Sequence, residues 1–124
     1  MRKLLLFPLV FLSLHSFSGW EMSFCDSVDE KGNCIGKSES LTLSDTKVLL
    51  ANSSGLQTVK VFFEILLVDQ NTFAEELIGT EEIKTEITSL FASASIHFPK
   101  KGHYLIKARD SYKDYITSRE LEVK

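Results

Sequence analysis

The residues best suited to metal chemistry in this sequence are two histidines and three aspartates. His97 and His103 flank a predicted corner of the chain. Asp110 and Asp114 bracket the last predicted loop, and Asp69 ends an earlier predicted strand. Two imidazoles without a third ligand make a poor metal site, and the aspartates lack the D-x-D-x-D-G spacing of a calcium loop. Because aspartate at the edge of a turn also accepts backbone N–H groups, the sequence predicts no metal ligands and no other cofactor.

Hydrolytic chemistry has no complete set of residues in this chain. The serines lack the Gly-x-Ser-x-Gly elbow that exposes a nucleophile, and His97 and His103 lie in one corner. Six glutamates are candidates for the paired carboxylates of a glycosidase: Glu64, Glu75, Glu76, Glu81, Glu82 and Glu86. Six such residues without a defined pair are typical of a solvated acidic face. We therefore expect no catalytic residues and no enzyme, with a small secreted hydrolase or inhibitor as the alternative.

The segment Asp110-Ser-Tyr-Lys-Asp-Tyr115 has the composition of a recognition loop. Tyrosine rings supply a large contact area at a small entropic cost, and their polar neighbours supply adaptable hydrogen bonds. The candidate binding loop therefore consists of Asp110, Tyr112, Asp114 and Tyr115. The alternative is that one ring folds back over the core while the other pairs across strands.

Residues 1–18 have the three parts of a secretory signal peptide. Two basic residues open the segment, an apolar run over 4–14 follows, and Ser16 and Ser18 stand at the −3 and −1 places of a cleavage site. The run is too short to span a bilayer. We expect a cleaved signal peptide over 1–18 and a single domain over 19–124. The mature chain then has no membrane span and is secreted, periplasmic or attached to the cell envelope.

The chain's charge narrows the classes of partner. It has 124 residues, of which 25% are charged and 44% apolar, the balance of one globular domain. The formal net charge of −3 becomes −5 when Arg2 and Lys3 leave with the signal peptide. An acidic surface is poorly suited to nucleic acid, and no basic amphipathic stretch is present to hold an anionic membrane. We therefore expect a protein or glycan partner and no nucleic acid.

The two cysteines, Cys25 and Cys34, are expected to form one disulfide in the oxidising compartment that export implies. Between them, Asp29 is placed to open a turn and Gly32 to supply a positive φ. Two short antiparallel strands on either side of this turn would bring the sulfur atoms together. A redox-active pair or half of a metal site is the alternative, but a Cys-x-x-Cys spacing is missing.

Apolar residues alternate with a period of two in several segments that are separated by turn residues. Segment 59–68 is predicted as a long central strand, and 71–82 as a turn or short helix before an edge strand. Further strands are predicted over 41–43, 48–51, 83–87, 91–98, 104–109 and 115–123. This spacing predicts an all-β, two-sheet antiparallel sandwich of about seven to nine strands.

The run 96–110, Ile-His-Phe-Pro-Lys-Lys-Gly-His-Tyr-Leu-Ile-Lys-Ala-Arg-Asp, is followed by a short loop and then by Leu-Glu-Val-Lys over 121–124. It resembles the last three strands of bacterial immunoglobulin-like domains. The resemblance implies an immunoglobulin-like sandwich over 19–124, with Tyr104 as a corner tyrosine whose hydroxyl bonds to upstream backbone. Two features differ from the antibody-type branch of this family. The cysteines lie together near the start of the chain instead of bridging two sheets, and Trp20 lies at the mature N-terminus instead of in a core strand.

These observations favour an exported, non-enzymatic binding or adhesion module. Small sandwich domains commonly act by presenting loops on a rigid frame, here toward a protein or glycan at the cell envelope or outside the cell. The alternative is a structural accessory subunit that pairs through an exposed edge strand, with the threonine-rich stretch 82–88 as the candidate edge.

Overall fold

The computed structural model describes residues 19–36, 40–41 and 46–124. The predicted signal peptide over 1–18 and residues 42–43 of the predicted strand 41–43 lie outside these described residues. The described residues form strands and connecting loops without a helix, so the all-β prediction is confirmed for them. Among them, no helical segment has the length and apolar character needed to cross a membrane.

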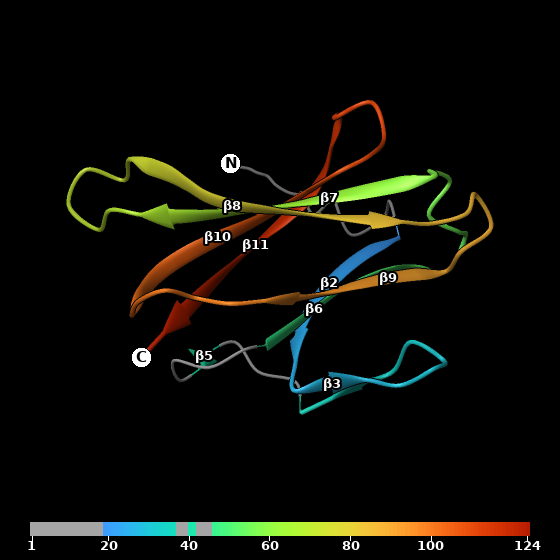
Figure 1. Cartoon of the computed structure of the whole chain (residues 1–124), viewed down its shortest axis with the longest axis horizontal. Coiled ribbons are helices and arrows are strands. Elements are labelled where there is room, and N and C mark those ends of the chain that lie inside the picture. Colours follow the sequence, from blue (N-terminus) through green and yellow to red (C-terminus); the bar gives the residue numbers. More distant parts are fainter. Residues whose placement is uncertain (1–18, 37–39, 42–45) are drawn as a thin grey trace, which may run out of the picture.

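The larger sheet has five strands in the order β5-β11-β10-β7-β8 (Figure 1). Its strands are β5 (Ser40–Leu41), β7 (Lys60–Val68), β8 (Glu75–Lys84), β10 (Gly102–Arg109) and β11 (Tyr115–Val123). Neighbouring strands are antiparallel except for β5 and β11, which are parallel. The prediction of wholly antiparallel pairing is therefore wrong at this one short edge.

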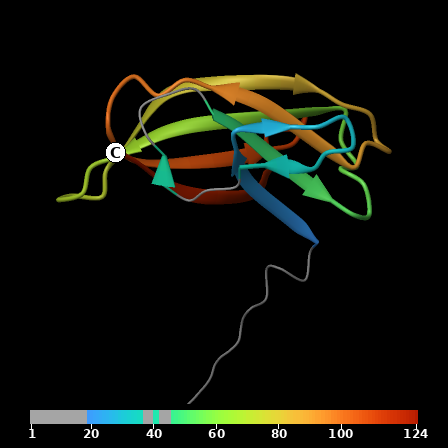
Figure 2. The same cartoon turned by 90° about the horizontal axis from the view of Figure 1, so that it is seen from below.

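A second sheet has the order β2-β6-β9, with β2 at Trp20–Cys25, β6 at Thr46–Asn52 and β9 at Phe91–Ile96. The hairpin of β3 (Ser27–Val28) and β4 (Cys34–Ile35) forms a third, two-stranded sheet. Figures 1 and 2 show this hairpin beyond the three-stranded sheet, on the side away from the five-stranded sheet.

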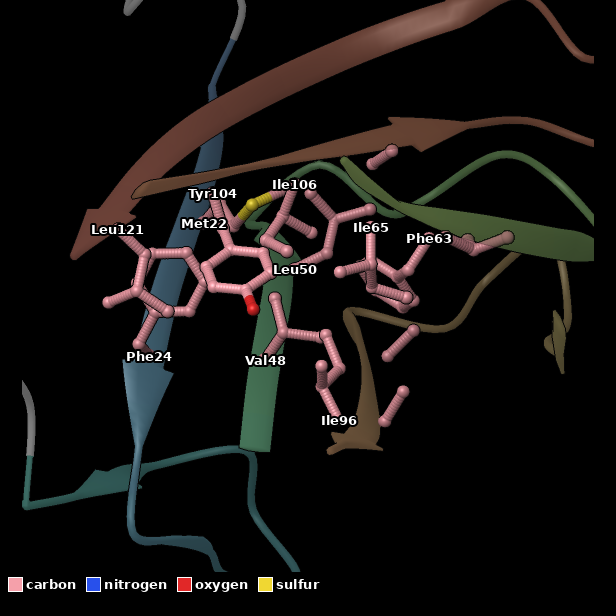
Figure 3. Packing of buried hydrophobic residues seen from close by; sticks show 14 of the residues in the cluster. Met22, Phe24, Val48, Leu50, Phe63, Ile65, Ile96, Tyr104, Ile106 and Leu121 are labelled. Atoms are coloured by element: carbon pink, nitrogen blue, oxygen red, sulfur yellow. The ribbon is translucent and has the colours of Figure 1, made fainter. Parts of the chain in front are cut away.

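One hydrophobic cluster draws its side chains from both larger sheets (Figure 3). Period-two alternation explains its composition, because every second residue of β7 and β10 points to the same face. The fully buried members include Phe24, Leu50, Phe63, Ile106 and Val123. The edge strand β8 contributes only side chains that are partly buried, Ile78 and Ile83.

The disulfide and the turn predicted between the cysteines are confirmed. Cys25 at the end of β2 is bonded to Cys34 in β4, with their Cα atoms 5.5 Å apart. Asp29 accepts hydrogen bonds from the backbone N–H groups of Lys31 and Asn33, at 2.9 and 2.8 Å. The Asn33 N–H is the main reason that the pKa of the Asp29 carboxyl lies below its ordinary value of 3.8. Gly32 has a φ of +84°, which a residue with a Cβ rarely adopts.

The segment 71–88 differs from its prediction. No helix follows Asn71. Asp69 instead closes a turn by accepting N–H groups from Asn71 and Thr72, which lower the pKa of its carboxyl, and β8 begins at Glu75. Pairing with β7, where Leu66 lies opposite Leu77, outweighs the helical preference of the Ala-Glu-Glu-Leu sequence. The predicted strand over 83–87 ends at residue 84, and residues 85–88 belong to a loop.

Tyr104 makes the hydrogen bond that the resemblance implies. Its ring is buried among side chains from both sheets, with 1% of the residue exposed (Figure 3). Its hydroxyl donates to the backbone carbonyl of Lys100 at 2.6 Å, across the corner between β9 and β10. The same ring lies 4.8 Å from the ring of Phe98, measured between centroids. The corner is therefore fixed by one buried hydrogen bond and one aromatic contact.

Replacing Tyr104 with phenylalanine is expected to lower the free energy of unfolding by about 1 kcal/mol at neutral pH, because the corner loses a buried hydrogen bond. Burial raises the pKa of Tyr104 above its ordinary value of 10.0, so the unfolded chain releases this proton at a lower pH than the folded chain. The stabilisation is therefore complete below pH 10 and is lost as the pH rises toward the folded-state pKa.

Urea unfolding of the parent and of Tyr104→Phe, at pH 7 and at several values above pH 10, measures both effects. The stability gap between the two proteins is expected to narrow above pH 10, because the variant has no phenol to ionise at this position. Every other effect of pH is common to both proteins and so cancels in the comparison. A gap that stays constant with pH would show that burial of the Tyr104 hydroxyl does not affect its ionisation.

Candidate functional site

Three loops are joined to one another by hydrogen bonds at one end of β7; in Figure 1 two of them lie at the right, and the third, between β10 and β11, lies at the top. They are 53–59 between β6 and β7, 85–90 between β8 and β9, and 110–114 between β10 and β11. We call this region the loop end. The first two loops are joined by backbone hydrogen bonds from Leu56 N to Ser89 O at 2.7 Å and from Gln57 N to Ile87 O at 3.0 Å. Such paired backbone gives the loops a strand-like rigidity.

Thr58 links all three loops. It is 5% exposed, and its backbone carbonyl accepts the Thr85 hydroxyl at 2.6 Å. Its own hydroxyl accepts the backbone N–H of Ser111 at 3.0 Å and donates to the carbonyl of Lys60 at 2.9 Å. Sequence reasoning did not identify this residue, because its partners lie up to 53 positions away and leave no local pattern.

Both aspartates of the candidate binding loop take part in the hydrogen bonds that form its turn. The Asp110 carboxylate accepts the backbone N–H groups of Tyr112 at 2.9 Å and Asp114 at 3.0 Å. The Asp110 N–H donates to the Asp114 carbonyl, and Lys113 between them has a φ of +68°. Asp110 is therefore occupied in holding the turn, which is the local role expected of aspartate at a loop edge.

The two tyrosines of the loop have different surroundings. Tyr112 is 85% exposed at the tip of the loop, and its backbone N–H donates to the Asp110 carboxylate. Tyr115 is 57% exposed and lies at the start of β11, with its hydroxyl 2.9 Å from the hydroxyl of Ser118 on the same strand. The ring of Tyr112 is therefore available for contact with a partner, whereas Tyr115 is already engaged along its own strand.

The base of loop 110–114 packs on an aromatic and charged surface of the five-stranded sheet. The ammonium groups of Lys113 and Lys60 lie 4.7 and 5.7 Å from the ring centre of Phe62. Arg109 donates to Glu64 at 2.9 Å and to the carbonyl of Lys113 at 3.2 Å. These contacts hold the loop in one position, because cation–π and charge-assisted bonds both act on Lys113.

Exposed apolar side chains gather at the loop end. Besides Tyr112, they are Val59, Ile87 and Leu90, each more than half exposed. A depression of about 600 Å³ lies between loops 53–59 and 85–90, and no charged residue lines it. The centres of protein interfaces have a similar composition, because they contain few charged residues and many apolar and aromatic side chains.

The carboxylates and imidazoles considered for metal chemistry do not form a cluster. Within the described part of the chain, no group of three or more such side chains is close enough to hold a metal ion. β7 and β10 run antiparallel with Val68 opposite His103, so Asp69 and Asp110 lie at opposite ends of this strand pair. His103 lies beside Glu122 at 3.8 Å.

Three of the six glutamates are paired with cations on the five-stranded sheet. Glu64 bonds to Arg109, Glu75 lies 3.3 Å from Lys107, and Glu82 lies 3.1 Å from Lys60. The Glu64 and Glu82 pairs connect neighbouring strands, and the Glu75 pair spans β7 to join β8 with β10. The three carboxylates therefore act as cross-strand ion pairs of the sheet.

Compared with models of known protein families and with curated proteins, the sequence matches none of them.

Proposed function

We propose that this chain is an exported, non-enzymatic binding module with immunoglobulin-like architecture that contacts a protein or glycan through the loop end. The observation that carries the proposal is the exposed ring of Tyr112 on a loop whose base is rigidly held. A rigid aromatic side chain binds with little loss of conformational entropy, which is why tyrosine is enriched in recognition loops.

The strand order supports the immunoglobulin-like part of the proposal. In immunoglobulin domains, strands A, B and E share one sheet, while G, F and C share the other, which C′ extends in the variable type. Taken in chain order, β2, β6 and β9 take the places of A, B and E. The order β11-β10-β7-β8 then corresponds to G, F, C and C′. Tyr104, near the start of β10, has the position and the hydrogen bond of the tyrosine corner.

The disulfide supports export. A bond between Cys25 and Cys34 is compatible with an oxidising, extracellular compartment, because cytosolic thiols are kept reduced. Secretion, the periplasm and the cell envelope all meet this condition, and the predicted signal peptide would deliver the chain to any of them.

Replacing Tyr112 with serine is expected to weaken partner binding at least about tenfold, because exposed aromatic anchors contribute most of the energy of small interfaces. The test is affinity capture from envelope and extracellular fractions with oxidised protein spanning residues 19–124, which include every described strand. The captured ligand is then titrated against the parent and the variant.

Phe73→Ser is the matched control, since Phe73 is a 73% exposed aromatic residue in the loop between β7 and β8, at the opposite end of β7 from the loop end. It should leave the affinity unchanged. A ligand held equally by the parent and by Tyr112→Ser would contradict binding through the loop end. Loss of binding by Phe73→Ser alone would place the site at the other end of the molecule.

The second candidate function is that of an accessory subunit that pairs through β8, and it is favoured by the position of β8 at one edge of the five-stranded sheet. This strand includes residues 82–84 of the stretch predicted from sequence. Four glutamates lie on β8, so its pairing partner would be a strand with basic side chains.

A further inference from the structure

The edges of the two larger sheets are protected to different degrees. β8 carries four glutamates and a register shift opposite Ile65 and Leu66. At the other edge, β5 pairs only with Glu122 and Val123 of β11, and β11 itself carries charged residues and a register shift opposite Ala108 and Arg109. On β2, the carbonyl of Met22 accepts a hydrogen bond from Arg119 at 2.8 Å. Charges, bulges and covering side chains are the features by which proteins prevent unwanted pairing at a sheet edge.

β9 has neither charged residues nor a register shift along its six residues. Its sequence, Phe-Ala-Ser-Ala-Ser-Ile, contains no charged residue and no proline. It pairs in unbroken register with β6 on one side and is the last strand of its sheet on the other. A regular, uncharged edge strand is a template for a further strand.

The chain segment that leads into β9 is also uncharged. The segment 87–96, which runs from the preceding loop to the end of β9, contains no charged residue in a chain that is 25% charged. Lys47 lies opposite Ser95 on the neighbouring strand β6, and its ammonium donates to the Ser95 hydroxyl at 2.5 Å. Leu90, immediately before β9, is 56% exposed and extends the apolar character of the edge.

We propose that β9 pairs with β9 of a second copy of this chain, so that two three-stranded sheets join into one continuous sheet. A two-fold axis perpendicular to the sheet makes the two strands antiparallel and places residues of the same face opposite each other. In one register, Ser93 lies opposite Ser93 of the second copy, Ser95 lies opposite Phe91, and Ala92 lies opposite Ala94. In the other register, Ser93 lies opposite Ser95, and Ala92 lies opposite Ile96. No like charges are opposed in either register.

A second copy fits this edge better than it fits the edge at β8. Two β8 strands would oppose their glutamates, and like charges directly opposite each other are destabilising. The small side chains at 92–95 also let two backbones approach without steric conflict. Because six residues make a short strand pair, the dimer is expected to form at micromolar concentrations, on the order of 10–100 µM.

Sedimentation equilibrium of oxidised protein between about 1 µM and 1 mM tests the pairing, with an expected rise from the mass of one chain to that of two. The double variant Ser93→Glu, Ser95→Glu opposes two glutamates in either register and is expected to raise the dissociation constant at least about tenfold. The matched control, Ser93→Thr with Ser95→Thr, keeps the strand neutral and should still form the dimer.

Two further measurements separate loss of pairing from loss of folding. The single variant Ser95→Glu gains Lys47 as an ion-pair partner within its own chain, so it should stay folded while its association weakens. Amide hydrogen exchange over 91–96 should slow as the protein concentration rises, whereas exchange over the β8 residues 75–84 should not change.

A monomer at every concentration would overturn the proposal. So would a dimer that tolerates both glutamates, or one whose added protection from exchange lies outside 91–96. The pairing does not depend on ligand binding at the loop end, so failure of either proposal leaves the other unaffected.

Discussion

Phe98→Ala is expected to lower the free energy of unfolding by about 3–5 kcal/mol, the usual cost of removing a buried aromatic ring from a core. Phe98 is 1% exposed and lies in the corner between β9 and β10, against the ring of Tyr104. Truncation leaves a cavity under this corner, which few neighbouring side chains can fill because the interior is close-packed. Urea unfolding monitored by tryptophan fluorescence and circular dichroism measures the loss.

Phe73→Ala provides the control for this prediction, since it removes the same ring from a position that is 73% exposed. It should change stability by less than about 0.5 kcal/mol in either direction, as surface substitutions usually do. Combining Phe98→Ala with Tyr104→Phe in a double-mutant cycle tests whether the aromatic contact and the hydroxyl bond act together. Equal losses for Phe98→Ala and Phe73→Ala would mean that the corner does not form part of the core.

Sequence patterns predicted the long inner strands well, because their alternation reflects burial on one face. Segment 59–68 was predicted as a strand, and β7 covers Lys60–Val68 with Val61 and Phe63 buried. The turn around Asp29 and Gly32 was likewise predictable, since its hydrogen bonds lie within four residues and Gly32 supplies the positive φ. Local chemistry and regular burial are the two signals that a single sequence carries clearly.

β8 was predicted least well, because the alternation is weak in a strand that is largely exposed. Most of its residues are exposed, and the bulge opposite Ile65 and Leu66 shifts the alternation partway along the strand. Its glutamates and leucine favour a helix by intrinsic propensity, so only pairing with β7 decides the strand. Tertiary pairing of this kind has no signature in the segment itself.

The candidate site was partly predictable for the same physical reasons. Loop 110–114 follows from local turn chemistry, and in the structure it connects β10 to β11 with Tyr112 exposed. The joining of this loop to residues 53–59 and 85–90 depends on Thr58, whose hydrogen bonds connect distant parts of the chain. The packing of Gly32 against the Phe91 side chain is another such long-range contact. A single sequence shows the members of these contacts but not their pairing.

Removing the disulfide, by the double substitution Cys25→Ala and Cys34→Ala, is expected to lower the free energy of unfolding by about 2–3 kcal/mol. The bond closes a loop with a sequence separation of nine, so its loss increases the conformational entropy of the unfolded chain by the amount expected for a short loop. Because a domain of this size has only about 5–15 kcal/mol of stability, the variant should unfold at a clearly lower urea concentration.

The effect should be concentrated in the hairpin of β3 and β4, which the bond attaches to the end of β2. Amide exchange is therefore expected to accelerate most over 26–36, whereas exchange in β7 and β10 should accelerate only as far as the lower free energy of global unfolding requires. The control is the parent protein treated with reductant, which removes the bond without changing a side chain and should show the same pattern. If exchange accelerated uniformly over the strands, the disulfide would instead stabilise the whole domain as one cooperative unit.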